Sequence, residues 1–354
     1  MRGVRVSRSL MLLFVLAGLT TGAYSSPADS ALFFNRSAGL KPPAGSFRVY
    51  HAKSGVDYAY IQPPNARYLN FVVSDYRDYF ATTFRVDNIP YIGAMAIATG
   101  FLVDIDQDIT DQAQHLGDRL GLKHTNKQKA LFKWSLKLGG KSVQTPLNFP
   151  QDLESGMYFL GDGIVHSSVA VGLWGYGKAA GDDRAVQTGT QCMEAIICTG
   201  VGVQILKHSF GRESPQVATE PGGKWRPLPN PADYQRHVPN YDAMPSGHIA
   251  TAMATVTVIA DNYPDKRWIR PLGYSLMGVL MYAMLNNGVH WASDYPLGIS
   301  LGYAFAKICD QRSRTIIAKS AAESSSGPTS LLRHTAVVPY WENRSAGLSV
   351  IYQF

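Results

Sequence analysis

Charged residues and cysteines are both scarce in this chain of 354 residues, and each scarcity narrows the kind of protein it is. Three cysteines are too few for a disulfide scaffold. Cys192 and Cys198 fall on different faces of one expected helix, so we expect buried free thiols, with a bridge to Cys309 as the alternative. No compact basic tract or RNA-binding signature is present, which makes nucleic acid a poor candidate partner.

Apolar residues are plentiful, yet few of them form runs long enough to cross a membrane. Hydrophobic residues make up 45% of the chain and charged residues 17%, and the mean hydropathy is −0.09. A spanning helix needs about twenty apolar residues, and Leu272–Leu285 comes closest. We therefore favour a water-soluble or membrane-peripheral protein over an integral membrane bundle. Lys and Arg outnumber Asp and Glu by 33 to 26, which suits anionic substrates or an anionic membrane surface.

The first residues have the pattern of a secretory signal peptide. Three arginines within the first eight residues precede an apolar run from Leu10 to Leu19, and small residues surround Ala23 and Ser25. This pattern predicts a signal peptide at residues 1–25 and an exported protein of the periplasm or cell envelope. An uncleaved membrane anchor is the alternative interpretation.

The remaining chain divides into three parts. Residues 26–90 are rich in Pro, Tyr and Phe and predict an irregular N-terminal arm. Residues 91–312 predict an all-α bundle of about six core helices, because long apolar segments without strand alternation favour helices. Residues 313–354 predict a flexible linker and a short strand-like C-terminal tail. The six predicted helical segments are Ile92–Val103, Gly163–Tyr176, Ala195–Leu206, Ile249–Ala260, Leu272–Leu285 and Leu297–Ile308.

Two charged stretches carry little functional signal. Asp104, Asp106 and Asp108 alternate like the start of a calcium loop. That loop would need glycine where Ile109 stands and glutamate where His115 stands, so we interpret the stretch as a solvated acidic helix start. The basic stretch from residue 123 to residue 141 is interpreted as another solvated face.

The segment Met244–His248 predicts a helix start that can bind an anion. Pro245 ends any preceding helix, and Ser246 is a suitable N-cap for the helix that follows. Gly247 allows the backbone to approach a ligand closely, and the free amides at the helix start favour phosphate. His248 would project toward the bound group. An ordinary capped helix with a surface histidine is the alternative.

A second histidine lies at a predicted junction between helices. Gly288 resembles a helix C-cap and Pro296 an early position of the next helix, so His290 can project into a pocket. Asp294 can accept a proton from one imidazole nitrogen and leave the other as a nucleophile. A purely structural His–Asp pair is the alternative. Upstream, Lys207 and Arg212 can neutralise a phosphate, or be two surface cations.

Taken in order, these segments resemble the type 2 phosphatidic acid phosphatase superfamily, which includes bacterial acid phosphatases and vanadium haloperoxidases. The resemblance covers roughly residues 162–308 and implies an all-α bundle. It implies that His290 attacks phosphorus to form a phosphohistidine, that Asp294 orients His290, and that His248 donates a proton to the leaving oxygen and then helps activate water. The implied ligands of the phosphate oxygens are Lys207, Arg212, Ser246 and Gly247.

Two positions depart from the family pattern. Ser214 and Met284 stand where the family usually has arginines of the phosphate clamp. Loss of one charge-assisted contact could reduce the rate by about two orders of magnitude. Arg212 would compensate in part, and neutral donors could come from Asn286 or Asn287.

The leading hypothesis is an exported, metal-independent hydrolase of phosphomonoesters or diphosphates, including lipid phosphates, with contact to a membrane surface as a further expectation. No cofactor is expected, and vanadate is expected to inhibit. The alternatives are a haloperoxidase with vanadate as cofactor, and a degenerate envelope protein that binds phosphate without turnover.

Overall fold

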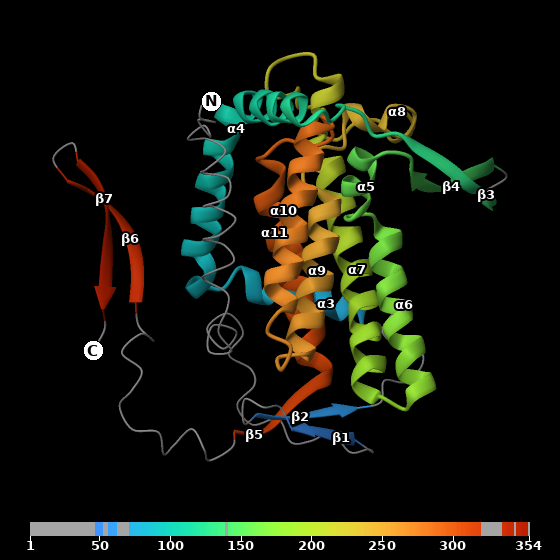
Figure 1. Ribbon diagram of the computed structural model, residues 1–354, viewed down its shortest axis with the longest axis vertical. Coiled ribbons are helices and arrows are strands. Elements are labelled where there is room, and N and C mark those ends of the chain that lie inside the picture. The colour runs from blue at the N-terminus through green and yellow to red at the C-terminus, as the bar shows by residue number, and fades with distance from the viewer. Residues whose placement is uncertain are drawn as a thin grey trace.

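The computed structural model describes residues 47–51, 56–61, 71–138, 141–319, 335–342 and 345–352 (Figure 1). Two predictions concern residues outside these ranges. They are the signal peptide at residues 1–25 and most of the flexible linker that begins near Ser320.

Five long helices run alongside one another and form the body of the bundle (Figure 1). Each contains one of the predicted helical segments, and the predicted all-α class is confirmed. Their apolar faces meet in a common core, which is what long apolar segments without strand alternation require. They are α6 (Gly163–Ala180), α7 (Asp183–Phe210), α9 (Gly247–Asn262), α10 (Ile269–Asn286) and α11 (Asp294–Ser313).

Short-range signals set the ends of these helices. Asp162, Asp182 and Ser246 cap α6, α7 and α9 by accepting backbone N–H groups of the first turn. Gly181 and Gly211 end α6 and α7 in the left-handed conformation that glycine adopts without a steric cost. Because α7 ends at Gly211, the chain changes direction shortly after Lys207.

The helix α4 (Ile89–Leu120) is much longer than the predicted segment Ile92–Val103. No residue of α4 before Leu102 is buried, whereas Leu102, Asp106 and Ile109 are buried farther along the helix. Figure 1 shows the second half crossing one end of the bundle. The interpretation of residues 104–108 as a solvated helix start is therefore wrong, because the helix runs through them and turns Asp106 inward.

The prediction of an irregular arm at residues 26–90 is wrong for part of its length, because α3 (Val72–Thr83) lies within it. Tyr76 and Tyr79 of α3 pack on Phe305 of α11 with ring centroids 5.0 and 4.9 Å apart. The two tyrosines are one helical turn apart, but the residues between them are mixed, so no apolar stripe marked the helix.

The remaining elements are short. The strands β1 and β2 pair in an antiparallel sheet with β5, in the order β1-β2-β5. Part of the predicted basic solvated face forms β3, which pairs with β4. The predicted strand-like tail is confirmed by β7, which pairs with β6. Their bounds are Phe47–His51 (β1), Val56–Ile61 (β2), Gln128–Leu138 (β3), Lys141–Pro150 (β4), Leu153–Phe159 (α5), Pro231–Arg236 (α8), Arg314–Lys319 (β5), Thr335–Glu342 (β6) and Ser345–Tyr352 (β7), with 3-10 turns at Val86–Asn88, Pro215–Val217 and Val238–Asn240.

The main hydrophobic core lies where α9 and α10 meet the second half of α4. Ile109, Ile249 and Leu280 are almost fully buried there. A second part of the core lies between α7 and α11, where the three cysteines are buried as free thiols, as predicted. The core therefore holds the start of α9 and the end of α10 rigidly beside the crossing part of α4.

Candidate active site

The predicted site residues converge at the end of the bundle that α4 crosses. The Ser246 N–H at the start of α9 donates to the Asp294 carbonyl at the start of α11, at 3.1 Å. The Ala243 N–H donates to the carbonyl of Arg212, which follows α7, at 3.0 Å. The rings of His248 and His290 lie 6.2 Å apart between centroids. Three segments that are distant in sequence thus form one site.

The His290–Asp294 pair has the geometry of an oriented imidazole. Nδ1 of His290 lies 3.3 Å from Oδ2 of Asp294, which also accepts the Trp291 N–H at 2.8 Å. Arg212 donates to Oδ1 of Asp294 at 2.8 Å. Burial alone would raise the pKa of Asp294, but Arg212 and His290 outweigh it and hold the pKa below its usual value. A charged Asp294 fixes the Nδ1–H tautomer and leaves Nε2 as the nucleophilic nitrogen.

His248 lies in a less polar setting. Its ring packs on Tyr158 with centroids 4.3 Å apart. A Cβ at Gly161 would lie 2.7 Å from the His248 Cβ. The link between α5 and α6 therefore packs closely against this histidine. Burial, and then the nearby His290, Lys207 and His166, lower the pKa of His248 well below its usual value. His248 is therefore neutral near neutral pH and becomes a proton donor under acidic conditions.

Ser246 and Gly247 occupy the helix start as predicted. The Ser246 Oγ accepts the Ile249 N–H at 3.5 Å and lies 3.5 Å from the Met284 Sδ, to which it donates. A Cβ at Gly247 would lie 3.3 Å from Val203 and 4.0 Å from Nζ of Lys207. A side chain at residue 247 would thus be tight against Val203, and its absence leaves the backbone of the α9 start next to Lys207.

Lys207 lies in the last turn of α7, beside Gly247, and its side chain is almost fully buried. Its Nζ donates to both carboxylate oxygens of Asp242, at 2.9 and 3.1 Å. The predicted phosphate ligand is therefore at the α9 start, but its charge is already matched by a carboxylate that the sequence analysis did not single out.

Arg212 does not lie where a phosphate could reach it, which corrects the prediction that it holds phosphate oxygens. Its side chain is fully buried. Nε and Nη2 donate to the Gly222 carbonyl. Nη1 donates to Ser293 and Asp294, and Nη2 also donates to Asp106. All of its donor groups are thus used inside the protein. Because an uncompensated charge cannot be buried, Arg212 is a structural link between α4 and α11.

Asp106 is the residue of this site that sequence reasoning missed. It accepts from Arg212 at 2.7 Å and from the Ser293 N–H at 3.0 Å. Burial and the neighbouring charge of Asp294 raise its pKa to about 6, against the opposing effect of Arg212. The available signal was its position on the helical stripe of Leu102, Ile109 and Ala113, where a charged residue needs a partner.

Glu213 is a second buried acid that sequence reasoning missed. It pairs with Arg226 at 2.6 Å and accepts the N–H groups of Thr219 and Lys224, each at 2.9 Å. Burial opposes these bonds, but together they lower the pKa of Glu213 to about 2. Its contacts close the loop between α7 and α8 on itself.

The two positions that depart from the family pattern are both buried. The Ser214 N–H donates to the Pro239 carbonyl at 2.8 Å, and Met284 packs under Ser246. Around the site the cations Lys207, Arg212 and Arg226 all have carboxylate partners. Of these three cations Lys207 lies next to Gly247 at the α9 start, and Asp242 already neutralises it.

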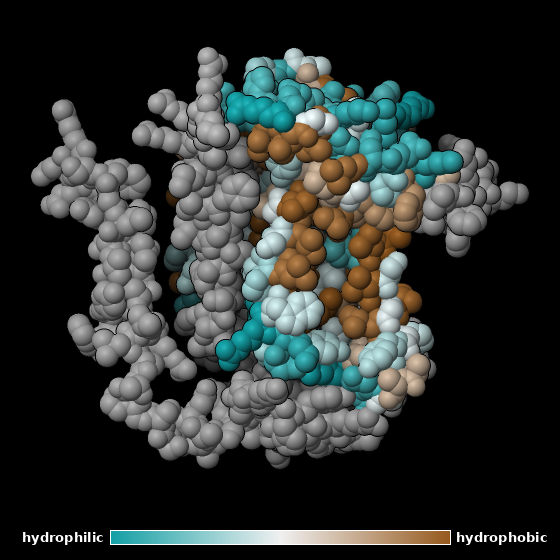
Figure 2. All heavy atoms as spheres, in the orientation of Figure 1, coloured by the Kyte–Doolittle hydropathy of each residue, from teal (hydrophilic) through white to brown (hydrophobic). Residues whose placement is uncertain are grey.

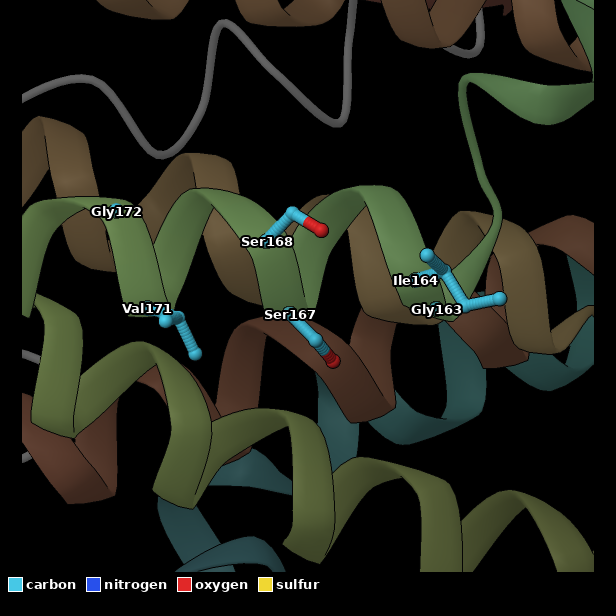
Figure 3. A pocket seen from close by; sticks show the side chains of 6 residues that line it. All are labelled: Gly163, Ile164, Ser167, Ser168, Val171 and Gly172. Carbon is cyan, nitrogen blue, oxygen red and sulfur yellow. The ribbon is translucent and has the colours of Figure 1, made fainter. Parts of the chain in front are cut away.

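Two other features lie apart from this site. A shallow hollow is lined by Gly163, Ile164, Ser167, Ser168, Val171 and Gly172, and Figure 3 shows that all of them belong to α6. It contains none of the predicted site residues, so it is not the phosphate site. A buried group with metal-ligand atoms within 4.8 Å of one another lies on α3, α7 and α11, and consists of Asp75, Glu194 and Cys309.

A family model described as the PAP2 superfamily matches residues 189–316. The predicted resemblance to this superfamily is confirmed. The matched PAP2 segment includes every predicted site residue from Lys207 to Asp294, whereas α4 with Asp106 lies outside it. No curated protein and no solved structure matches the chain. The PAP2 superfamily acts on phosphorylated substrates, so a phosphate-bearing ligand is the general expectation for this site.

Proposed function

We propose that the protein is an exported phosphatase that hydrolyses phosphomonoesters or diphosphates through a phosphohistidine. The observation that carries this proposal is the His290–Asp294 pair at 3.3 Å beside His248 and the capped start of α9. It is supported by the PAP2 segment, which contains all of these residues. An oriented imidazole, a second histidine and a helix start together provide a nucleophile, an acid and an anion site.

In the proposed reaction the Nε2 of His290 attacks phosphorus while the ester oxygen leaves. His248 in its protonated form gives its proton to that oxygen, and Asp294 stabilises the positive charge that develops on His290. Neutral His248 then takes a proton from water, which attacks the phosphohistidine and releases phosphate. The backbone amides at Gly247 and His248, together with Lys207, stabilise the charge on the transferred group.

We further propose that the substrate is a lipid phosphate reached at a membrane surface. Figure 2 shows hydrophobic residues over the middle of the visible face, between more hydrophilic ends. By length and composition, Val86–Leu120 is the one described helix that could cross a membrane, and 11% of its apolar window is buried. That helix, and not Leu272–Leu285 as predicted, comes nearest to a membrane segment, because it is longer than the predicted segment Ile92–Val103. Membrane contact would bring the apolar part of a lipid close to the site.

A second candidate function is phosphate binding without turnover, in an envelope protein built on a degenerate phosphatase bundle. The observation that favours it is the burial of Arg212 in ion pairs with Asp106 and Asp294. Together with Ser214 and Met284, this leaves Lys207 as the described cation nearest the α9 start. The same observation weakens the haloperoxidase alternative, since a bound vanadate would need strong charge neutralisation.

Phosphate release by the purified mature protein, without added metal, tests the proposal. The panel contains one soluble ester and several lipid phosphates, each assayed with the unchanged protein, with His290→Ala, and with vanadate. Release that requires His290 and is blocked by vanadate supports the phosphohistidine route. Release that persists in His290→Ala contradicts it. If no ester is hydrolysed but vanadate still binds, the binding function is favoured, and oxidation of halide by peroxide with vanadate would favour the haloperoxidase.

A further inference from the structure

Lys207, which lies beside the proposed phosphate site, forms an ion pair with Asp242. Nζ of Lys207 lies 2.9 and 3.1 Å from the two carboxylate oxygens of Asp242. It also lies close to the point where a side chain at residue 247 would begin. A carboxylate that contacts an ammonium with both oxygens makes the same kind of charge-assisted contact as two oxygens of a phosphate. Lys207 must therefore exchange partners, or share them, when a phosphate arrives.

The two partners differ in their freedom to move. The side chain of Lys207 is 7% exposed and that of Asp242 is 24% exposed. The backbone next to Asp242 is fixed, because the Ala243 N–H donates to the Arg212 carbonyl at 3.0 Å. We therefore expect the more exposed carboxylate, and not the ammonium, to turn toward water when a phosphate binds.

We infer that Asp242 is an internal competitor for the phosphate, which occupies Lys207 in the empty site and lowers the affinity of the site for phosphate. The inference rests on the proposed function, since it assumes that phosphate binds at the α9 start. Its consequence is easy release of inorganic phosphate after hydrolysis, because Asp242 recaptures Lys207 as the product leaves. A residue of this kind tunes affinity and takes no part in bond breaking.

Removing the competitor should strengthen binding, which a merely structural residue would not do. We expect Asp242→Asn to bind inorganic phosphate and vanadate about tenfold to a hundredfold more tightly than the unchanged protein, the range set by one charge-assisted hydrogen bond. In assays of turnover, KM and the inhibition constant for phosphate should both fall. Asp242→Glu keeps a carboxylate and should show a smaller change.

Calorimetric titration of the full chain with inorganic phosphate, and then with vanadate, measures this effect. Asp233→Asn is the matched control, because Asp233 lies on α8, is largely exposed and pairs with Arg236. It removes the same charge without touching Lys207. In a Lys207→Ala background the effect of Asp242→Asn should disappear, which separates competition for the lysine from a general change in charge.

The outcomes distinguish this inference from the proposed function. Tighter binding in Asp242→Asn but not in Asp233→Asn supports the inference. Equal or weaker binding in a folded Asp242→Asn protein, with its melting temperature as the check, overturns it while phosphate binding itself stands. Absence of binding in every variant, including Asp242→Asn, overturns the proposed function and the inference with it.

Discussion

The residues proposed to react and the residues predicted to hold phosphate differ in how far they follow the expected arrangement. His248, His290 and Asp294 lie close together, and Asp294 is placed to orient the His290 ring. Among the residues predicted to hold phosphate, Ser246 and Gly247 form the helix start, but Lys207 and Arg212 are paired with carboxylates. The difference teaches that the arrangement of the histidines and the placement of the cations can change separately, because carboxylates that the fold places beside a cation can neutralise it within the protein.

The largest expected effect concerns the reacting residues. His248→Ala should lower kcat/KM about 10²- to 10⁴-fold, the usual contribution of a general acid. Because burial and neighbouring charges lower the pKa of His248 in the folded protein, its protonated form accumulates only as the pH falls. Activity of the unchanged protein should therefore rise toward acidic pH, and a pH–rate profile should lose that rise in His248→Ala. An identical profile in both proteins would assign the proton to another group.

The next effect separates a structural Arg212 from a phosphate ligand. Arg212→Met should lower the free energy of unfolding by about 3–5 kcal/mol, because it leaves Asp106 and Asp294 buried without a cation. Denaturant unfolding measures the change. The control is Arg226→Met, whose pair with Glu213 is partly exposed and whose loss should be smaller. If the Arg212→Met protein were as stable as the unchanged protein but had a raised KM, Arg212 would be a phosphate ligand after all.

A gain of activity should follow if the clamp is restored. Met284 lies under Ser246 at the α9 start, so Met284→Arg places a guanidinium near the phosphate. We expect kcat/KM to rise by up to about 10²-fold, the value of one strong donor, in spite of some loss of stability. Met281→Arg, at a buried methionine one turn earlier on α10, is the matched control and should only destabilise. Equal loss in both variants would show that the pocket no longer accepts an arginine.

The smallest effect tests the packing that positions His248. Gly161→Ala would bring a Cβ within 2.7 Å of His248 and 2.6 Å of Leu280, so the link before α6 must move. Overpacking of this kind costs about 1–3 kcal/mol, and we expect kcat to fall about tenfold with a lower melting temperature. Gly163→Ala is the control, since its Cβ would meet nothing within 4 Å. Similar behaviour of both variants would show that the link does not constrain His248.

Local signals predicted much of this arrangement. Ser246 as an N-cap, the glycine before His248 and the spacing of His290 and Asp294 are short-range features, and the structure has them as expected. Such local signals could not predict the partners of Arg212. Its partners Asp106 and Asp294 lie 106 and 82 residues away in the sequence, and only the tertiary packing of α4 and α11 brings them within hydrogen-bonding distance.

The sequence by itself determined the all-α class, the main helices and the positions of the two histidines, because helix periodicity and capping act over a few residues. The tertiary structure alone decided which charges are paired. A buried cation takes whichever carboxylates the fold places around it, since leaving it unpaired costs several kcal/mol. For that reason Lys207 faces Asp242 and Arg212 faces Asp106, neither of which a local pattern could have predicted.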